Sequence, residues 1–195
     1  MFTPKLLLML AALASVELGA RAFAGADETP PPSPHLGTPI SAAQAAPWHI
    51  DVEPNGAALP AGSGTPAEGS RIYAARCAAC HGADLRGTPV PGRAPFPALV
   101  GGEGSLASQH PKKTVGSYWP YATTVFDYIR RTMPFDHPQS LSSDQVYAVT
   151  AFVLAQNHII GQDATLDRKT LPKVRMPNRD GFYPNRTEGG LETLK

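Results

Sequence analysis

The stretch that decides how the chain can fold is Cys77-Ala78-Ala79-Cys80-His81. Its two cysteines are the only ones in the 195 residues, and their spacing is about one helical turn. Two thiols at this spacing can form thioethers with the two vinyl groups of a haem, and an imidazole directly after the second thiol can reach the iron from the same face. The pattern predicts one covalently bound haem c, attached at Cys77 and Cys80, with His81 as an iron ligand.

Two other roles are open to a Cys-x-x-Cys pair. A redox-active pair is expected in a thioredoxin-like βαβ context, and a zinc site needs two further ligands at suitable spacing. The sequence around Cys77 and Cys80 offers neither context. Haem attachment explains the motif better, because the adjoining histidine and the absence of any other cysteine agree with it.

Sequence signals for the start of a helix occur both before and after the Cys77–His81 motif. Thr65-Pro66-Ala67-Glu68 combines an N-cap, a proline at the first helical position and a capping-box glutamate. We expect a helix from here to the motif. Ser142-Ser143-Asp144-Gln145 forms a second capping box, and apolar residues then recur at spacings of three and four until Asn157 and Gly161.

A third helix is expected over residues 121–131, stopped by Pro134. Residues 82–119 are instead rich in proline and glycine and predict a long segment of turns. A bound haem can organise such a segment, since apolar side chains can pack on its faces. The fold class is therefore predicted to be all-α, with helices around one haem.

Residues 1–24 have the features of a secretory signal peptide. Lys5 precedes the apolar run from Leu6 to Val16, and Ala22-Phe23-Ala24 supplies small residues around a cleavage point. The run is about half the ~20 residues of a transmembrane helix, so an uncleaved anchor is the weaker alternative and membrane spanning is not expected. Cleavage leaves 15 basic and 15 acidic residues, a balance that does not suit nucleic-acid binding. We expect export to the periplasm.

The rest of the chain divides by composition, with glycine and proline making up one residue in five. Residues 25–64 predict an extended arm, residues 65–160 one domain, and residues 161–195 an extended tail. The arm and tail lack the periodicity of independent folding units, yet they hold bulky apolar side chains. We expect these to dock on a partner, the alternative being that they cover the haem domain. Examples are Trp48, Leu171, Met176 and Phe182.

The second iron ligand must come from elsewhere in the chain. Without the signal peptide only Met133 and Met176 remain among the methionines. Met133 is favoured, because it lies in a turn fixed by Pro134 between two expected helices, where a thioether can face the open side of the ring. His110, His137 or a vacant position are weaker alternatives.

Residues 65 to about 158 resemble a class I cytochrome c domain. The pattern Gly69-x-x-x-Tyr73-x-x-x-Cys77 resembles the first helix of that family, and Val149 with Phe152 matches the apolar pair on the terminal helix that crosses it. The family fold implies helices around one haem, with the long arms of this chain as extensions.

A closer resemblance covers roughly residues 45–184. It is to the cytochrome subunit of bacterial sulfane and sulfite dehydrogenases, the electron-accepting partner of a molybdenum subunit in the Sox sulfur-oxidation system. That resemblance implies one low-spin haem, periplasmic location and a dehydrogenase partner. Some members carry two haem domains, whereas this chain has one Cys-x-x-Cys-His motif. The resemblance rests on Lys113-Thr114-Val115-Gly116-Ser117-Tyr118-Trp119-Pro120-Tyr121-Ala122, Phe126-Asp127-Tyr128-Ile129-Arg130-Arg131-Thr132-Met133-Pro134-Phe135, Pro138-Gln139-Ser140-Leu141 and Met176-Pro177-Asn178-Arg179-Asp180-Gly181-Phe182.

Iron held by His81 and Met133 is coordinatively filled, which suits electron transfer rather than chemistry on a substrate. We expect a non-catalytic subunit that accepts electrons singly from a molybdenum-containing sulfite or sulfane dehydrogenase and passes them to a downstream cytochrome or oxidase. The alternatives are a freely diffusing carrier to a terminal oxidase and a haem enzyme, which would need an open iron or a ligating cysteine. A backbone carbonyl, with Pro97 as the candidate, is expected to orient His81.

Overall fold

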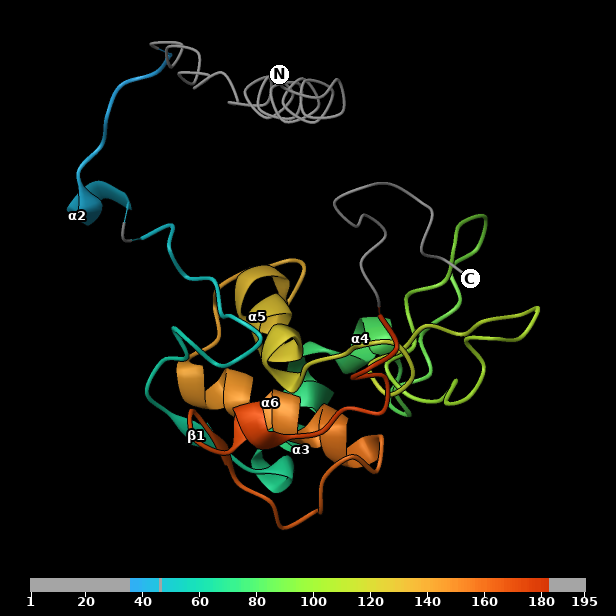
Figure 1. The fold of residues 1–195 in the computed structure, drawn as a ribbon. Coiled ribbons are helices and arrows are strands. Elements are labelled where there is room, and N and C mark those ends of the chain that lie inside the picture. The colour runs from blue at the N-terminus through green and yellow to red at the C-terminus, as the bar shows by residue number, and fades with distance from the viewer. Residues whose placement is uncertain (1–35, 46, 183–195) are drawn as a thin grey trace, which may run out of the picture. The chain divides into compact units, whose positions relative to one another are not determined.

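The computed structural model describes residues 36–45 and 47–182 (Figure 1). The expected signal peptide lies outside the described residues. One compact unit, Ala42–Lys195, holds all the elements named here, and residues 36–41 belong to a separate unit. In chain order the elements are α2 (Ala42–Ala45), β1 (Ser63–Gly64), α3 (Pro66–Arg76), α4 (Ala78–His81), α5 (Ala122–Thr132), α6 (Ser143–Gln156), β2 (Leu166–Asp167) and the 3-10 helix η1 (Leu171–Lys173).

Helix α3 begins as its capping box predicts. The Thr65 side chain accepts a hydrogen bond from the backbone N–H of Glu68, and the Glu68 carboxylate accepts one from the backbone N–H of Thr65 at 2.9 Å. Pro66 stands in the first turn, where its missing N–H costs no helical hydrogen bond. The sequence prediction of this helix start is confirmed.

Helices α3 and α6 cross at very close range. Gly69 lies against the backbone of Ala148, and a Cβ at this glycine would collide with the Ala148 carbonyl. The rings of Tyr73 and Phe152 meet at the same crossing, with centroids 5.1 Å apart. The absence of a side chain at Gly69 therefore sets the distance between the helix that leads to the cysteine motif and the central helix of the core.

Helix α6 is the centre of that core. Ser142 and Gln145 form the expected capping box, and the helix ends at Gln156 with Asn157 as its C-cap. Helix α5 packs on it, and the rings of Phe126 and Tyr147 lie 4.5 Å apart. The buried residues of α6 are Val146, Tyr147, Ala148, Val149, Thr150, Ala151, Val153, Leu154 and Ala155.

Helix α5 matches the expected helix over residues 121–131 within one residue at each end. Tyr121 is its N-cap and Met133 its C-cap, whose backbone N–H donates to the carbonyl of Ile129. The Met133–Pro134 peptide bond is cis. Between α4 and α5 the chain forms turns without a helix or a named strand, as its composition predicts.

Parts of both terminal segments pack on the helices. Strand β1 pairs antiparallel with β2, Gly64 opposite Leu166, so the segment before α3 and the segment after α6 lie side by side. Leu171 and Met176 are almost fully buried, whereas Trp48 is 81% exposed and Phe182 is 50% exposed. Leu171 and Met176 thus cover the core, whereas Trp48 stays exposed and the ring of Phe182 lies 5.2 Å from that of Tyr118. Docking of the exposed side chains on a partner stays a prediction.

The regular secondary structure of the described residues is mainly helical, with two strands of two residues each, and turns and loops make up the rest. Within those residues, we find no helix with the length and apolar character needed to cross a membrane.

Candidate haem site

The cysteine motif lies where α3 ends and a new turn of helix begins. Cys77 leaves helical geometry (φ −125°, ψ −33°) and serves both as C-cap of α3 and as N-cap of α4. Its carbonyl accepts hydrogen bonds from the backbone N–H groups of Cys80 at 3.1 Å and His81 at 2.9 Å. One tight turn therefore carries both thiols and the imidazole, which is the arrangement that attachment to a single ring needs.

The two thiols do not form a disulfide, and both residues are half-buried. Burial raises the pKa of the Cys77 thiol to about 11, although the nearby Arg76 opposes this effect. A redox-active or nucleophilic cysteine needs a lowered pKa, because the thiolate is the reactive form. The environment of Cys77 therefore favours a structural attachment over thioredoxin-like chemistry.

The imidazole of His81 is held in one orientation. Its Nδ1 lies 2.8 Å from the carbonyl oxygen of Pro97. Because a carbonyl can only accept, Nδ1 must carry the proton, and Nε2 is left as the nitrogen that can bind a metal. The expected role of Pro97 is confirmed by this contact.

The two methionines occupy different environments. Met133 is half-buried at the C-terminal end of α5, beside the buried Pro134 and the exposed Phe135. Met176 is 1% exposed and packs within the hydrophobic core. A thioether at the edge of the core can serve as a ligand, whereas that of Met176 already fills core space.

The two histidines weighed as alternatives are exposed. The backbone N–H of His110 donates to the hydroxyl oxygen of Ser108 at 3.2 Å, and the imidazole of His137 lies 3.8 Å from the carboxylate of Asp136. Among the described contacts, neither imidazole is held by a backbone carbonyl in the way that Pro97 holds His81. The structure thus gathers Cys77, Cys80 and His81 on one turn and places Met133 on a separate element.

The donor set and its surroundings fit a haem. The chain offers two thiols, one imidazole with a fixed tautomer and a thioether, and half-buried apolar side chains lie on the segments around them. An apolar ring system needs such side chains on its faces. These residues, which pack against the core without being enclosed by it, include Leu99, Val100, Trp119 and Ile129.

Sequence reasoning missed the buried polar residues that support these segments. Asn157 was expected only to end a helix, yet its side-chain amide donates to the Leu99 carbonyl at 3.0 Å. Asp127 is a buried carboxylate on α5 that accepts two hydrogen bonds from Arg131, one turn later. The i,i+4 spacing of an acid and a base was a usable signal for this pair. No comparable signal marked Asn157.

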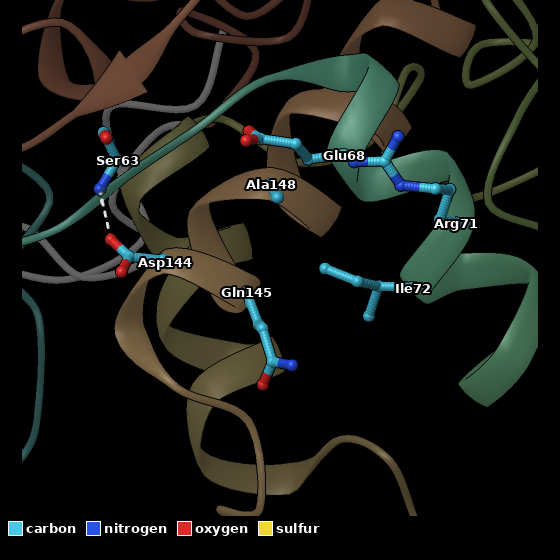
Figure 2. Close-up of a pocket in the computed structure, with 7 residues that line it drawn as sticks. All are labelled: Ser63, Glu68, Arg71, Ile72, Asp144, Gln145 and Ala148. Carbon is cyan, nitrogen blue, oxygen red and sulfur yellow. Dashed lines mark hydrogen bonds between the residues drawn. The ribbon is translucent and has the colours of Figure 1, made fainter.

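A surface pocket of about 420 Å³ lies between α3 and the start of α6 (Figure 2). Its two carboxylates take part in local hydrogen bonds, since an Asp144 oxygen accepts from the Ser63 N–H at 2.8 Å and Glu68 caps α3. None of the expected site residues lines it. Its lining residues are Ser63, Glu68, Arg71, Ile72, Asp144, Gln145 and Ala148.

The fold and the site define a c-type cytochrome. Residues 66–157 match the cytochrome c family. The chain also aligns with a chain in the crystal structure of the sulfane dehydrogenase SoxCD from Paracoccus pantotrophus, with 40% identity and a TM-score of 0.70, covering 83% of this chain and 78% of that one. The chain therefore belongs to the cytochrome c family of electron-transfer proteins, which carry covalently bound haem c.

Two curated relatives are thiosulfate dehydrogenases. The protein from Allochromatium vinosum is 35% identical over 101 residues, which is 51% of this chain and 34% of the relative. The protein from Stutzerimonas stutzeri is 29% identical over 136 residues, or 68% of this chain and 41% of the relative. The chain thus spans less than half the length of these relatives.

Proposed function

We propose that this chain is a periplasmic, single-haem electron-transfer subunit. It accepts electrons one at a time from a molybdenum-containing dehydrogenase that oxidises sulfite or a sulfane, and it passes them to a downstream cytochrome or oxidase. The observation that carries this proposal is the 40% identity with a chain of the sulfane dehydrogenase SoxCD over 83% of the sequence. The orientation of His81 by Pro97 supports the ligand assignment.

Each residue of the motif has a separate role. Cys77 and Cys80 would attach the haem covalently, His81 would offer Nε2 to the iron, and Met133 would offer its thioether to the iron. When bound, the haem supplies a one-electron ferric/ferrous couple, whose potential a thioether ligand raises. Pro97 keeps the proton of His81 on Nδ1, which fixes both the tautomer and the plane of the ring.

The same assignment excludes sulfur chemistry on the iron. His81 and Met133 would both bind the iron, and both cysteines of the sequence would be used in attachment. A sulfur substrate then has neither an iron position nor a free thiol to bind. The two-electron oxidation must occur on another protein, and this chain relays its electrons singly.

A second candidate is a haem enzyme that oxidises thiosulfate. The names of the two curated relatives favour it. It requires that the thioether of Met133 leave the iron or that this position be open, since a substrate needs a ligand site.

One experiment separates the two candidates. The oxidised protein is mixed with sulfite, thiosulfate or a sulfane donor, first alone and then with the molybdenum dehydrogenase, and haem reduction is followed by absorbance. We expect little reduction until the dehydrogenase is added and rapid reduction afterwards. Fast, saturable reduction by thiosulfate alone, with turnover, would replace the proposal with the catalytic candidate.

A further inference from the structure

We infer that Asn157 is a positioning residue for His81, acting through the backbone of residues 97–99. The inference rests on the proposed function, because it gives His81 the role of an iron ligand. Asn157 is the C-cap of α6, the central helix of the core, and is 7% exposed. It lies 76 positions after the histidine in sequence and touches neither thiol in any described contact.

The carbonyl that orients His81 lies in an exposed part of the segment between α4 and α5. Pro97 is exposed and has no N–H, so it cannot hold its own place through a backbone donor. Leu99, two residues later, is held through both its backbone N–H and its backbone carbonyl. The Leu99 N–H donates to the Leu85 carbonyl at 2.8 Å, and the Leu99 carbonyl accepts from Nδ2 of Asn157 at 3.0 Å.

The other hydrogen bonds of this loop come from nearby in the chain. Phe96 donates to the Thr88 carbonyl at 2.9 Å, and Val100 donates to the Leu85 carbonyl at 3.4 Å. These acceptors follow His81 in the same long turn segment. Among the described hydrogen bonds of residues 96–100, that of Asn157 is the one that ties the loop to α6. It therefore fixes the position of the Pro97 carbonyl relative to the core.

The amide of Asn157 has one possible orientation. Its Nδ2 donates both to the Leu99 carbonyl and, at 2.8 Å, to the Val153 carbonyl. Because both partners can only accept, the NH2 group must face them and Oδ1 must point away. Within the described part of the chain, this buried oxygen has no hydrogen-bond partner.

The unpaired Oδ1 indicates that the donors of Asn157, rather than its acceptor, are what this position uses. A buried acceptor without a donor is unfavourable, so the two donors on Nδ2 account for the presence of an amide here. Oδ1 lies against Gly116, where a Cβ would collide with it. The glycine thus provides the space that the amide needs in order to keep both donors on the carbonyls.

The first test is Asn157→Asp, which keeps the size of the side chain and removes both donors. In the reduced, diamagnetic protein we expect the His81 Nδ1–H to exchange with solvent about tenfold faster, the effect of losing one typical hydrogen bond. We also expect a changed midpoint potential with the covalent haem count unaltered. The matched control is Tyr147→Phe, which removes a 3.0 Å hydrogen bond to the Pro60 carbonyl from the same helix. It should leave both readouts of His81 at wild-type values.

Gly116→Ala is the second variant, and it decides the question if Asn157→Asp fails to fold. The new methyl group would meet Asn157 Oδ1 and, less closely, Glu103 Oε1, while every hydrogen-bonding group is retained. It should therefore reproduce the faster exchange and the changed potential. Wild-type exchange and potential in the folded variants would overturn the inference alone. A wild-type protein that carries no covalent haem would overturn the inference together with the proposed function.

Discussion

The buried carboxylate of Asp127 accepts a hydrogen bond at 3.0 Å from the backbone N–H of Val52, 75 positions earlier in the chain. Arg131 holds the same carboxylate through Nε at 3.0 Å and Nη2 at 2.6 Å, and it reaches Asp51 with Nη1 at 3.0 Å. The segment before β1 is thereby tied to α5, whose C-terminal end carries Met133.

Substituting the Asp127 carboxylate should weaken the contact between α5 and the segment before β1. Asp127→Asn removes the charge that Arg131 faces, and we expect the free energy of unfolding to fall by about 2 kcal/mol, because hydrogen bonds to charged groups are among the stronger ones. Urea denaturation of the haem-loaded protein measures this change. Asp136→Asn is the control, since that carboxylate is 79% exposed and its partner His137 lies 3.8 Å away. Equal losses in the two variants would contradict the role of Asp127.

The haem count follows from the single motif. A pyridine haemochrome assay of the exported protein should give one haem per chain, and acid-acetone extraction should leave the colour with the protein, because thioethers form at Cys77 and Cys80. In the double variant Cys77→Ala/Cys80→Ala any remaining haem should be extracted. A second haem, or colour that the solvent removes from the wild type, would show that the attachment is wrong.

Trp48 is expected to contact the dehydrogenase. Its side chain is 81% exposed, so Trp48→Ala should leave the melting temperature unchanged. Large aromatic side chains dominate many interfaces, and we expect the affinity for the partner to fall about tenfold. Leu171→Ala is the contrasting variant, because that side chain is fully buried and its truncation should cost about 2–5 kcal/mol of stability. The affinity is measured by calorimetric titration with the dehydrogenase. If Trp48→Ala binds as tightly as the wild type, Trp48 has no role in docking.

Alkaline conditions should weaken the fold through Tyr147. Burial raises the pKa of Tyr147 to about 12, whereas an unfolded tyrosine loses its proton near about pH 10. Between these values the unfolded state binds fewer protons, so the free energy of unfolding falls as pH rises above about 10 and is unaffected by this group at lower pH. The urea midpoint of the wild type should therefore decline more steeply above about pH 10 than that of Tyr147→Phe. Parallel pH profiles would contradict this account.

The elements that carry local signals could be predicted from the sequence. Thr65 and Ser142 begin their helices as expected, because a capping box is a local arrangement of four residues. A backbone carbonyl was also expected to orient His81, with Pro97 as the candidate, and the structure shows this contact. Only the structure shows that the segment around Pro97 folds back far enough for its carbonyl to reach His81.

What could not be predicted depends on contacts between distant segments. Met176 and Leu171 lie in a tail without periodicity, so nothing in their spacing indicated that they complete the core. Asn157 was visible as a helix end, but its second acceptor, the Leu99 carbonyl, is 58 positions away. Burial of Asp127 likewise depends on Val52, which belongs to the expected arm.

The central claim is that His81 and Met133 close both axial positions of one haem. The most direct measurement is the weak long-wavelength sulfur-to-iron charge-transfer band of the oxidised protein, recorded for the wild type, Met133→Ala and Met176→Ala. The account predicts that the band is present in the wild type, is lost in Met133→Ala and persists in Met176→Ala, whose truncation in the core lowers stability instead. Survival of the band in Met133→Ala, or its loss in Met176→Ala alone, would contradict the account.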